Sequence, residues 1–494
     1  MQRFVFIGID AADRTLLRRW AGEGVLPTFR RLLQTGAVAE CRSPWVFYVG
    51  AQWPSFYTGL NTAGHGRYCY EQLAPGTYDS PRFPASSIAG TPFWDPLSEQ
   101  GRTFTVIDVP KTVLSRRLRG TQIVDWTTHD PEAPGFCAAP AAERAEVAGR
   151  YGGNPDDNCN RQERTAEGFA RFRERLKDRV GRKERLLGDY LERGGWDAFV
   201  CAFADSHCAG HQGWHLHDPS HDRHDAELAA AAGNPVRDAY AAIDGALGRL
   251  LAKVPQDCVV AVLASHGMGP HWDGTHLMDE VLARLDAALP HGRAPRASRA
   301  VNAARERLQH IRPWRMRKHM PRPLSHRAFR KVFWIPNNEA WLGLRLNLEG
   351  REPLGRIRPA EQAPYAAALM QALAELRVGA PDGPPAFSEI ATTREHLQGA
   401  LIDTLPDIVA RWTRHRPFTA LCSPLIGRVE GSYKGVRTGD HMPDGLLMVA
   451  GPGIAAGDRP ACAVEDLAPS FAAMLGGRLG PGDGRALDWL RPAA

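Results

Sequence analysis

Six of the chain's 18 histidines fall in one segment, DSHCAGHQGWHLHDPSHDRH, which spans residues 205 to 224. Neutral imidazole is a common protein ligand for zinc and related divalent metals. His207 and His211 are four residues apart, so one helical turn would place both rings on the same side. The segment therefore predicts a metal site. Its remaining histidines are more typical of surface or hydrogen-bonded rings: His215, His217, His221 and His224.

Three further candidate ligands come from distant parts of the chain. Asp10 ends the apolar run RFVFIGID, His266 lies in ASHGM, and His441 lies in TGDHMPDG. Ligands that converge from separate segments are more typical of catalytic than of structural metal sites. The set therefore indicates a catalytic centre assembled by the fold.

Short, continuously apolar runs predict strands that are buried on both faces of a parallel sheet. They cover residues 3–10, 104–110, 198–205, 258–268 and 445–454. Helical patterns separate them, at 15–35, 163–195 and 235–254. This alternation predicts an α/β fold with a central, mostly parallel sheet. Ligands bind beyond the carboxyl ends of such strands, where Asp10, Asp205 and His266 fall.

The length of 494 residues allows one large α/β core with an insertion. We expect the core in residues 1–272 and 439–494, with an inserted cap at 273–438. Within the cap, residues 293–331 carry 13 Lys and Arg against a single acid. That basic segment attracts anionic substrates, forms a membrane-surface or nucleic-acid patch, or is a solvated helical insertion.

Other protein classes are poorly matched. No apolar run is long enough to span a membrane, and the N-terminal residues do not resemble a secretory signal, so we expect a cytoplasmic protein. The nine cysteines form no CxxC pair, which argues against a disulfide framework or a zinc knuckle. Phosphate-loop and GxSxG motifs are absent, and the scattered tryptophans do not favour nucleic acid as a partner.

The motif WPSFYTGLNTAGHGRY, at residues 53 to 68, follows GID and precedes the histidine-rich segment, HGM and GDHMPDG. In this order the motifs resemble the alkaline phosphatase superfamily, in particular its type I phosphodiesterase/nucleotide pyrophosphatase branch. Segments at 347–357, 405–412 and 465–476 are similar to that branch as well. The resemblance implies a three-layer sandwich around a mostly parallel sheet, with an inserted cap.

In that family two metal ions, usually zinc, lie side by side, and a Thr or Ser attacks phosphorus. The resemblance places Asp10 and His266 as ligands of the ion next to this nucleophile, and His211 and His441 as ligands of the other. His207 stands where the family has an Asp, and zinc accepts either residue type. Asp205, two residues earlier, is an alternative ligand.

Two other positions depart from the family pattern. Val49 occupies the nucleophile position, and valine can neither attack phosphorus nor bind a metal. Ser265 stands where an Asp normally precedes the HGM histidine. His271 and His276 follow in the same region, but histidines in such turns are common.

Three explanations follow from these departures. Another hydroxyl, from Tyr48, Ser43 or Ser265, acts as nucleophile; a metal-activated water attacks directly; or the chain is a catalytically silent relative that binds a metal or ligand. We expect a metal-dependent hydrolase of phosphate esters, phosphodiesters above all, that uses one or two divalent ions, zinc first, and activated water. Its substrate would be a small anionic ester, with sulfate and phosphonate esters as further options. The sequence sets neither the substrate nor the oligomeric state.

Overall fold

The computed structural model of the chain describes residues 2–129, 131, 135–156, 158, 160–161, 163–290, 325–337 and 340–490. The chain divides into two compact units. Unit 1 comprises Met1–Tyr68, Pro84–His271 and Gly435–Ala494, and unit 2 comprises Cys69–Phe83 and Trp272–Lys434. The second unit thus includes a short segment from early in the chain beside the expected cap. Most of the basic segment 293–331 lies outside the described residues.

A large mixed sheet forms the centre of unit 1, with strand order β18-β2-β17-β7-β1-β6-β3-β4-β5 and β19 beside β2. The five central strands β7, β1, β6, β3 and β4 run parallel to one another. At the two ends of this run, β17 is antiparallel to both β7 and β2, and β5 is antiparallel to β4. Their bounds are β1 Phe4–Ile9, β2 Ala37–Arg42, β3 Phe104–Ile107, β4 Gly120–Val124, β5 Cys137–Ala139, β6 Ala198–Phe203, β7 Val259–Ala264, β17 Gly445–Ala450, β18 Gly457–Asp458 and β19 Cys462–Ala463. A separate antiparallel pair joins β8 Gly267–Pro270 to β16 Gly439–Met442.

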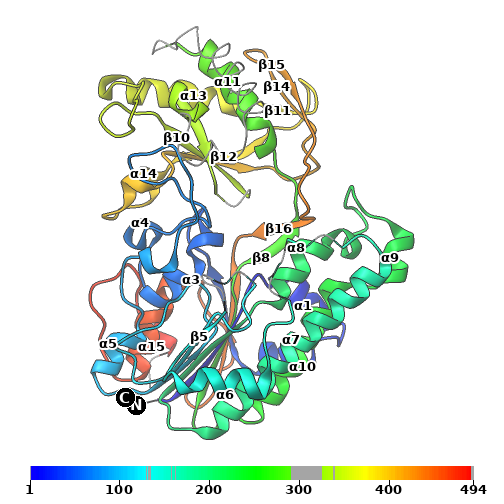
Figure 1. The fold of residues 1–494 in the computed structure, drawn as a ribbon, viewed down its shortest axis with the longest axis vertical. Helices are drawn as coiled ribbons and strands as arrows, with labels where there is room; N and C mark the ends of the chain where they lie inside the picture. The colour runs from blue at the N-terminus through cyan, green and yellow to red at the C-terminus, as the bar shows by residue number, and fades with distance from the viewer. Residues whose placement is uncertain are drawn as a thin grey trace, which may run out of the picture. The chain divides into compact units, whose positions relative to one another are not determined.

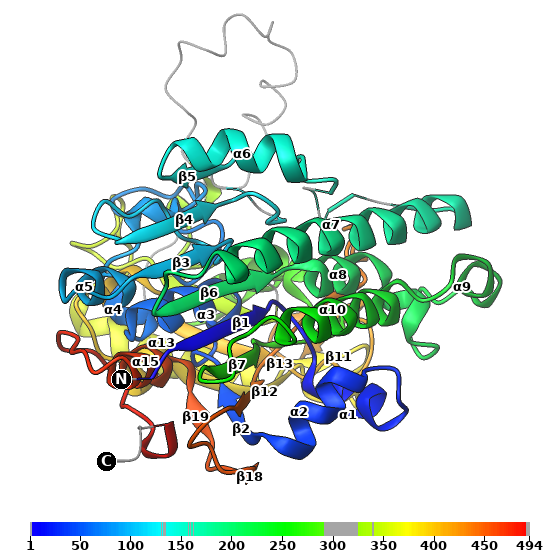
Figure 2. The ribbon, with the colours of Figure 1, turned by 90° about the horizontal axis from the view of Figure 1, so that it is seen from below.

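Helices cover both faces of this sheet (Figures 1 and 2). One face packs against α1 Arg14–Gly22, α2 Pro27–Thr35, α7 Ala166–Arg193, α8 Asp205–His217 and α10 Pro235–Leu251. The other packs against α3 Tyr48–Thr58, α5 Trp94–Glu99 and α15 Leu467–Met474. The remaining helices of the unit are α4 Thr62–His65, α6 Ala142–Tyr151 and α9 Ala226–Ala232. The three-layer α/β architecture expected from the sequence is confirmed.

The helix expected over residues 15–35 is in fact two helices. Gly24 has a φ of 82° and ends the first, and Pro27 begins the second, where its missing N–H is tolerated. The break lets α1 and α2 both place their apolar sides on the same core.

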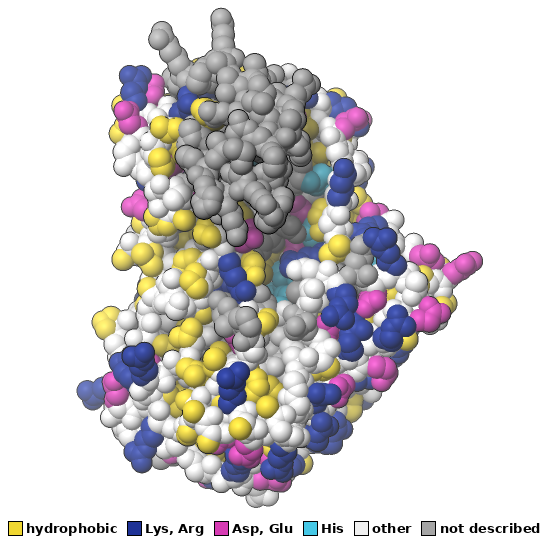
Figure 3. Space-filling model, in the orientation of Figure 1, with side chains coloured by type: hydrophobic (Ala, Val, Ile, Leu, Met, Phe, Trp, Pro, Cys, Tyr) yellow, Lys and Arg dark blue, Asp and Glu magenta, His cyan; other side chains and the backbone are white. Residues whose placement is uncertain are grey.

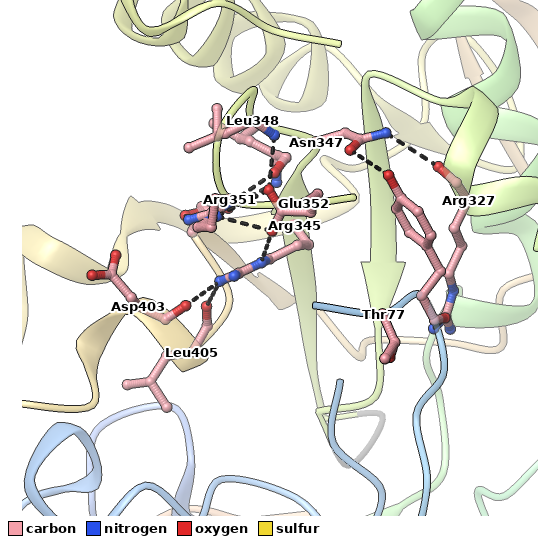
Figure 4. Close-up of polar contacts among 12 residues, drawn as sticks. Thr77, Arg327, Arg345, Asn347, Leu348, Arg351, Glu352, Asp403 and Leu405 are labelled. Atoms are coloured by element: carbon pink, nitrogen blue, oxygen red, sulfur yellow. Dashed lines mark hydrogen bonds and ion pairs between the residues drawn. The ribbon is translucent and has the colours of Figure 1, made fainter. Parts of the chain in front are cut away.

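Unit 2 is built around a four-stranded antiparallel sheet of order β12-β13-β10-β9. Its elements are α11 Met278–Ala288, α13 Gln362–Ala374, α14 Thr393–His396, β9 Val332–Ile335, β10 Trp341–Leu346, β11 Arg377–Val378, β12 Phe387–Thr392, β13 Ile408–Trp412, β14 Ala420–Ser423 and β15 Gly427–Glu430. Buried Arg345 at the end of β10 donates to Glu352 and to the carbonyl oxygens of Asp403 and Leu405 (Figure 4). Glu352 thus compensates the buried charge of Arg345 within the unit.

Among the described residues, no helix is both long and apolar enough to cross a membrane. The eight cysteines within the described ranges are all free thiols.

Gly8, near the end of β1, leaves space for the indole of Trp53 from α3. A Cβ at Gly8 would lie 2.3 Å from Trp53 Cη2, much closer than atoms can approach. Trp53 is almost fully buried, and its Nε1 donates to Asp10 Oδ1 at 2.8 Å. The glycine of the GID motif thus lets a rigid ring hold the first candidate ligand.

We predict that Gly8→Ala lowers the free energy of unfolding by about 1–3 kcal/mol, because the buried indole has no room to move. Chemical denaturation measures the change. The control is Gly22→Ala, where a Cβ would meet nothing within 4 Å and alanine favours the helix. Equal stability of the two variants would show that Trp53 does not depend on Gly8.

Candidate metal centre

Helix α8 starts directly beyond the carboxyl end of β6 and carries the first two candidate ligands. His207 and His211 lie one turn apart on this helix, and both are buried. His441 reaches them from β16, whose pairing with β8 sets it opposite Met268. One potential ligand atom from each of the three rings lies within 4.8 Å of the others. The structure therefore brings together three histidines that the sequence predicted as ligands.

The hydrogen bonds of His211 fix which of its nitrogens can bind a metal. Its Nδ1 lies 2.8 Å from the carbonyl oxygen of Gly439, which can only accept, so Nδ1 carries the proton. The backbone N–H of Thr438 donates to the His211 carbonyl at 2.8 Å and holds β16 against α8. The lone pair of Nε2 is left directed at the other rings, as in many metal-binding histidines whose second nitrogen bonds a carbonyl.

His441 contacts a different histidine with each of its nitrogens. Nε2 lies 3.1 Å from His211 Nε2, and Nδ1 lies 2.9 Å from His266 Nε2. His266 Nδ1 in turn lies 3.2 Å from the hydroxyl of Ser265, which donates to Asp10 Oδ1 at 3.4 Å. A continuous series of polar contacts therefore runs from the three-histidine group to Asp10.

The rings of this group are neutral at physiological pH. Burial lowers the pKa of His207, His211 and His441 well below the usual histidine value, and the positive charge of Arg437 lowers all three further. Burial also lowers the pKa of His266. Neutral imidazole is the form that binds metals. Metal binding therefore does not require these rings to lose a proton first.

A second group joins Asp10, His129 and His207, again with ligand atoms within 4.8 Å. The ring of His129 stacks on that of His207 with centroids 3.8 Å apart. His129 follows β4. The sequence does not predict this strand, because its residues GTQIV are both polar and apolar. A histidine shortly after a strand end, in VDWTTHD, was the available signal.

Asp205, the alternative ligand, belongs to neither group. Its Oδ1 accepts from Arg179 Nε at 2.6 Å, and both side chains are fully buried. The other histidines of the segment are also bonded elsewhere. His215 Nδ1 lies 3.1 Å from Thr438 Oγ1, and the rings of His217, His221 and His224 contact Asn234, the Thr438 carbonyl and the His215 carbonyl. The backbone N–H of His271 donates to the Thr438 carbonyl, and His276 lies in unit 2.

Val49 is the second residue of α3, and its side chain is partly exposed. Just before it, Val46 has a φ of 51°, a strained conformation for a β-branched residue that is often found near functional sites. The Tyr48 hydroxyl donates to the carbonyl of His441 at 3.3 Å, and the buried Ser43 Oγ has no partner within the described residues. The Tyr48 hydroxyl is thus bonded to a carbonyl oxygen, which is too weak a base to activate it, whereas the Ser265 hydroxyl lies 3.2 Å from His266 Nδ1.

The profile of the family described as type I phosphodiesterase / nucleotide pyrophosphatase matches residues 4–419. The chain belongs to this family. A search of curated proteins gives no match. Among solved structures, human ectonucleotide pyrophosphatase/phosphodiesterase 5 is similar, with a TM-score of 0.52, 12% identity and coverage of 98% of this chain and 97% of that one. Its mouse counterpart gives a TM-score of 0.51 at 12% identity with the same coverage, and an inactive form of the mouse protein in complex with AMP gives 0.50 at 11%.

Members of this family typically depend on divalent metals, and the three-histidine group fits one such ion. His207 Nδ1 is buried without a hydrogen-bond partner in the described part of the chain, as expected of an atom placed to bind a metal. The second family position fits poorly. Val49 and Ser265 stand where the family has two of its ligands. The two ligands that remain are engaged, because Asp10 accepts from Trp53 and His266 lies against His441. No group of three potential ligands among the described residues includes His266.

The loop that carries His129 is held by a buried ion pair. Lys183 Nζ from α7 lies 3.0 Å from Asp108 Oδ2, and both side chains are essentially inaccessible. Asp108 also accepts from the backbone N–H groups of Trp126 and Thr127, at 2.7 and 2.9 Å. The carboxylate thus ties the end of β3 to the segment that leads into His129.

We predict that Lys183→Met lowers the free energy of unfolding by about 3–5 kcal/mol, because the Asp108 carboxylate is left buried without its cation. Chemical denaturation measures this loss. The control is Lys177→Met on the same helix, whose exposed pair with Glu174 should be worth less than about 1 kcal/mol. If both variants lose the same small amount, the buried pair does not hold this loop.

Proposed function

We propose that this chain is a metal-dependent hydrolase of phosphate esters, with phosphodiesters as the preferred class, and that it uses water as the nucleophile. One divalent ion, zinc in the first place, would be held by His207, His211 and His441. The observation that carries the proposal is the group of three buried, neutral imidazoles with ligand atoms within 4.8 Å. Three protein ligands with an open fourth position are the usual composition of catalytic zinc sites.

A count of formal charges favours one ion over two. The family pattern combines two divalent ions with three carboxylates, which leaves one net positive charge. Here only Asp10 remains of those carboxylates, because His207 and Ser265 replace the other two. One divalent ion with Asp10 again leaves one positive charge, whereas two ions would leave three. Uncompensated charge in a buried site is costly.

The chain's own residues have distinct parts in this proposal. A bound divalent ion would supply Lewis acidity, which lowers the pKa of water toward neutrality and offsets charge on the phosphate. Gly439 holds His211 in the tautomer that presents Nε2. His441 Nδ1 can then donate to His266, His266 to Ser265, and Ser265 to Asp10, so that every proton in the series has an acceptor. The positive charge of Arg437 would attract the anionic substrate.

A catalytically silent relative that binds a metal or ligand is the second candidate. The observation that favours it is Val49, because the side chain at the family's nucleophile position is unreactive. The two candidates agree on the ion and differ on turnover. They are therefore separated by metal content and activity measured on the same preparation.

We predict that purified protein loaded with zinc and then dialysed retains one equivalent per chain. Elemental analysis measures the content. His211→Ala should lose the ion, while His415→Ala, which removes an exposed histidine of unit 2, should retain it. The double variant Val49→Thr/Ser265→Asp restores the family ligands and should take up a second equivalent.

Two equivalents in the unmodified protein would contradict the single-ion proposal. Retention of the ion by His211→Ala would show that the ligands are assigned wrongly.

We predict that the zinc-loaded protein hydrolyses bis(4-nitrophenyl) phosphate and that His211→Ala reduces kcat/KM by about 10³-fold or more, because several kcal/mol of charge stabilisation are lost. Release of 4-nitrophenolate measures the rate, with His415→Ala as the control. Chelation should abolish turnover, and added zinc should restore it.

One tightly held equivalent without turnover of mono- or diesters would favour the silent relative. Full activity in His211→Ala would refute this site altogether.

A further inference from the structure

A polar cavity lies in unit 1 next to the three-histidine group. Its volume is about 260 Å³, below the range of about 300–1,000 Å³ that is usual for whole small-molecule ligands. It therefore suits one part of a larger molecule. The cationic residues of its described lining are all arginines: Arg161, Arg164 and Arg223.

The two acidic residues of the lining are engaged elsewhere. Glu163 Oε1 accepts from Arg175 Nη2 at 2.8 Å, and Asp225 Oδ1 accepts from the backbone N–H of Leu228 at the start of α9. Three arginines against two acids give the lining a net positive charge, and Arg175 from outside the cavity offsets the charge of Glu163. Figure 3 shows Lys and Arg side chains on the surface over α7, α8 and α9. Planar guanidinium groups bind phosphate through paired hydrogen bonds, which a lysine cannot provide.

Gln212 adds a neutral acceptor to the cavity wall. Its side chain is 6% exposed, and its Nε2 donates to the carbonyl of Asn158 at 3.4 Å. Its Oε1 is buried and has no hydrogen-bond partner within the described residues. A buried acceptor without a partner costs free energy, and rotation of this amide into the cavity that Gln212 lines would let a ligand hydroxyl relieve the cost.

Residues next in sequence to those of the candidate metal centre line the cavity. Gln212 follows His211 on α8, and His215 lies one turn beyond it, roughly 6 Å along the helix axis. On the other side, Val436 and Thr438 line the cavity and flank Arg437, whose charge acts on the three histidines. A substrate that reached both the cavity and the three-histidine group would therefore need a spacer between the two.

We infer that this cavity is a binding subsite for a phosphomonoester group carried on a hydroxylated spacer, as in a sugar phosphate. The three arginines bind the phosphate, and Gln212 Oε1 accepts from a spacer hydroxyl. This inference rests on the proposed function, because it assigns the cavity to an arm of the same substrate. It defines the substrate as a phosphodiester with a second, remote phosphate.

The test uses the full chain after removal of metals with EDTA, so that no ion contributes to anion binding. Isothermal titration compares ribose 5-phosphate, inorganic phosphate and ribose. Ribose 5-phosphate should bind once per chain and more tightly than inorganic phosphate. Ribose alone should not bind measurably.

Variants separate the two contacts of the subsite. Arg161→Gln/Arg223→Gln changes two exposed side chains and should weaken ribose 5-phosphate at least about tenfold, since hydrogen bonds to charged groups are strong. Gln212→Leu should weaken ribose 5-phosphate about fivefold and leave inorganic phosphate unchanged. Arg30→Gln, on the exposed side of α2, is the control for net charge and should have no effect.

Equal binding of ribose and ribose 5-phosphate, unchanged binding in the double arginine variant, or an equal loss in Arg30→Gln would each overturn the subsite. Turnover of bis(4-nitrophenyl) phosphate by zinc-loaded protein reports separately on the proposed function. Turnover without ribose 5-phosphate binding refutes the subsite alone. Binding without turnover supports the subsite and refutes the proposed reaction.

Discussion

The candidate centre depends on His441, whose ring offers two nitrogens and uses both. One lies against His211 and the other against His266. Since a neutral imidazole has one proton and one lone pair, a metal on one side determines the role of the other nitrogen. His266, a ligand in the family pattern, here serves as a hydrogen-bond partner of His441. Ser265 extends the same series of contacts to Asp10. The residues at the family's second metal position therefore help to orient the three-histidine group.

Beneath this arrangement, α7 supplies two buried cations to the edge of the sheet. Arg179 and Lys183 are four residues apart and pair with Asp205 and Asp108, which lie just after β6 and β3. Each pair fixes the start of a segment that carries a histidine of the site, α8 in one case and the loop to His129 in the other. The helix thus acts through charge as well as through apolar packing, because it sets where two strand ends begin to turn.

Much of this centre follows from sequence because parallel strands direct their following residues to one edge of the sheet. Asp10, His211 and His266 were predicted on that basis, and the structure brings them close to His441, which was predicted from the TGDHMPDG motif. The sequence did not predict which side chain each of these polar residues binds. Asp205 stands at a suitable place for a ligand, yet Arg179 binds it, and that arginine lies 26 residues away on a helix whose rotation the sequence does not set. His129 was not predicted as a ligand because the strand before it, β4, is short and contains both polar and apolar residues.

The pairing of β8 with β16 has a consequence for how such proteins diversify. Pro270 lies opposite Gly439, so the chain leaves unit 1 and returns to it at neighbouring positions of one antiparallel pair. Everything between them occupies the place of a hairpin turn. Insertions at such a position can lengthen, shrink or be exchanged during evolution while His266 and His441 keep their register. Segment 69–83, which belongs with the insertion, would have to change together with it. The inserted unit and the histidine group can therefore evolve at different rates within one polypeptide.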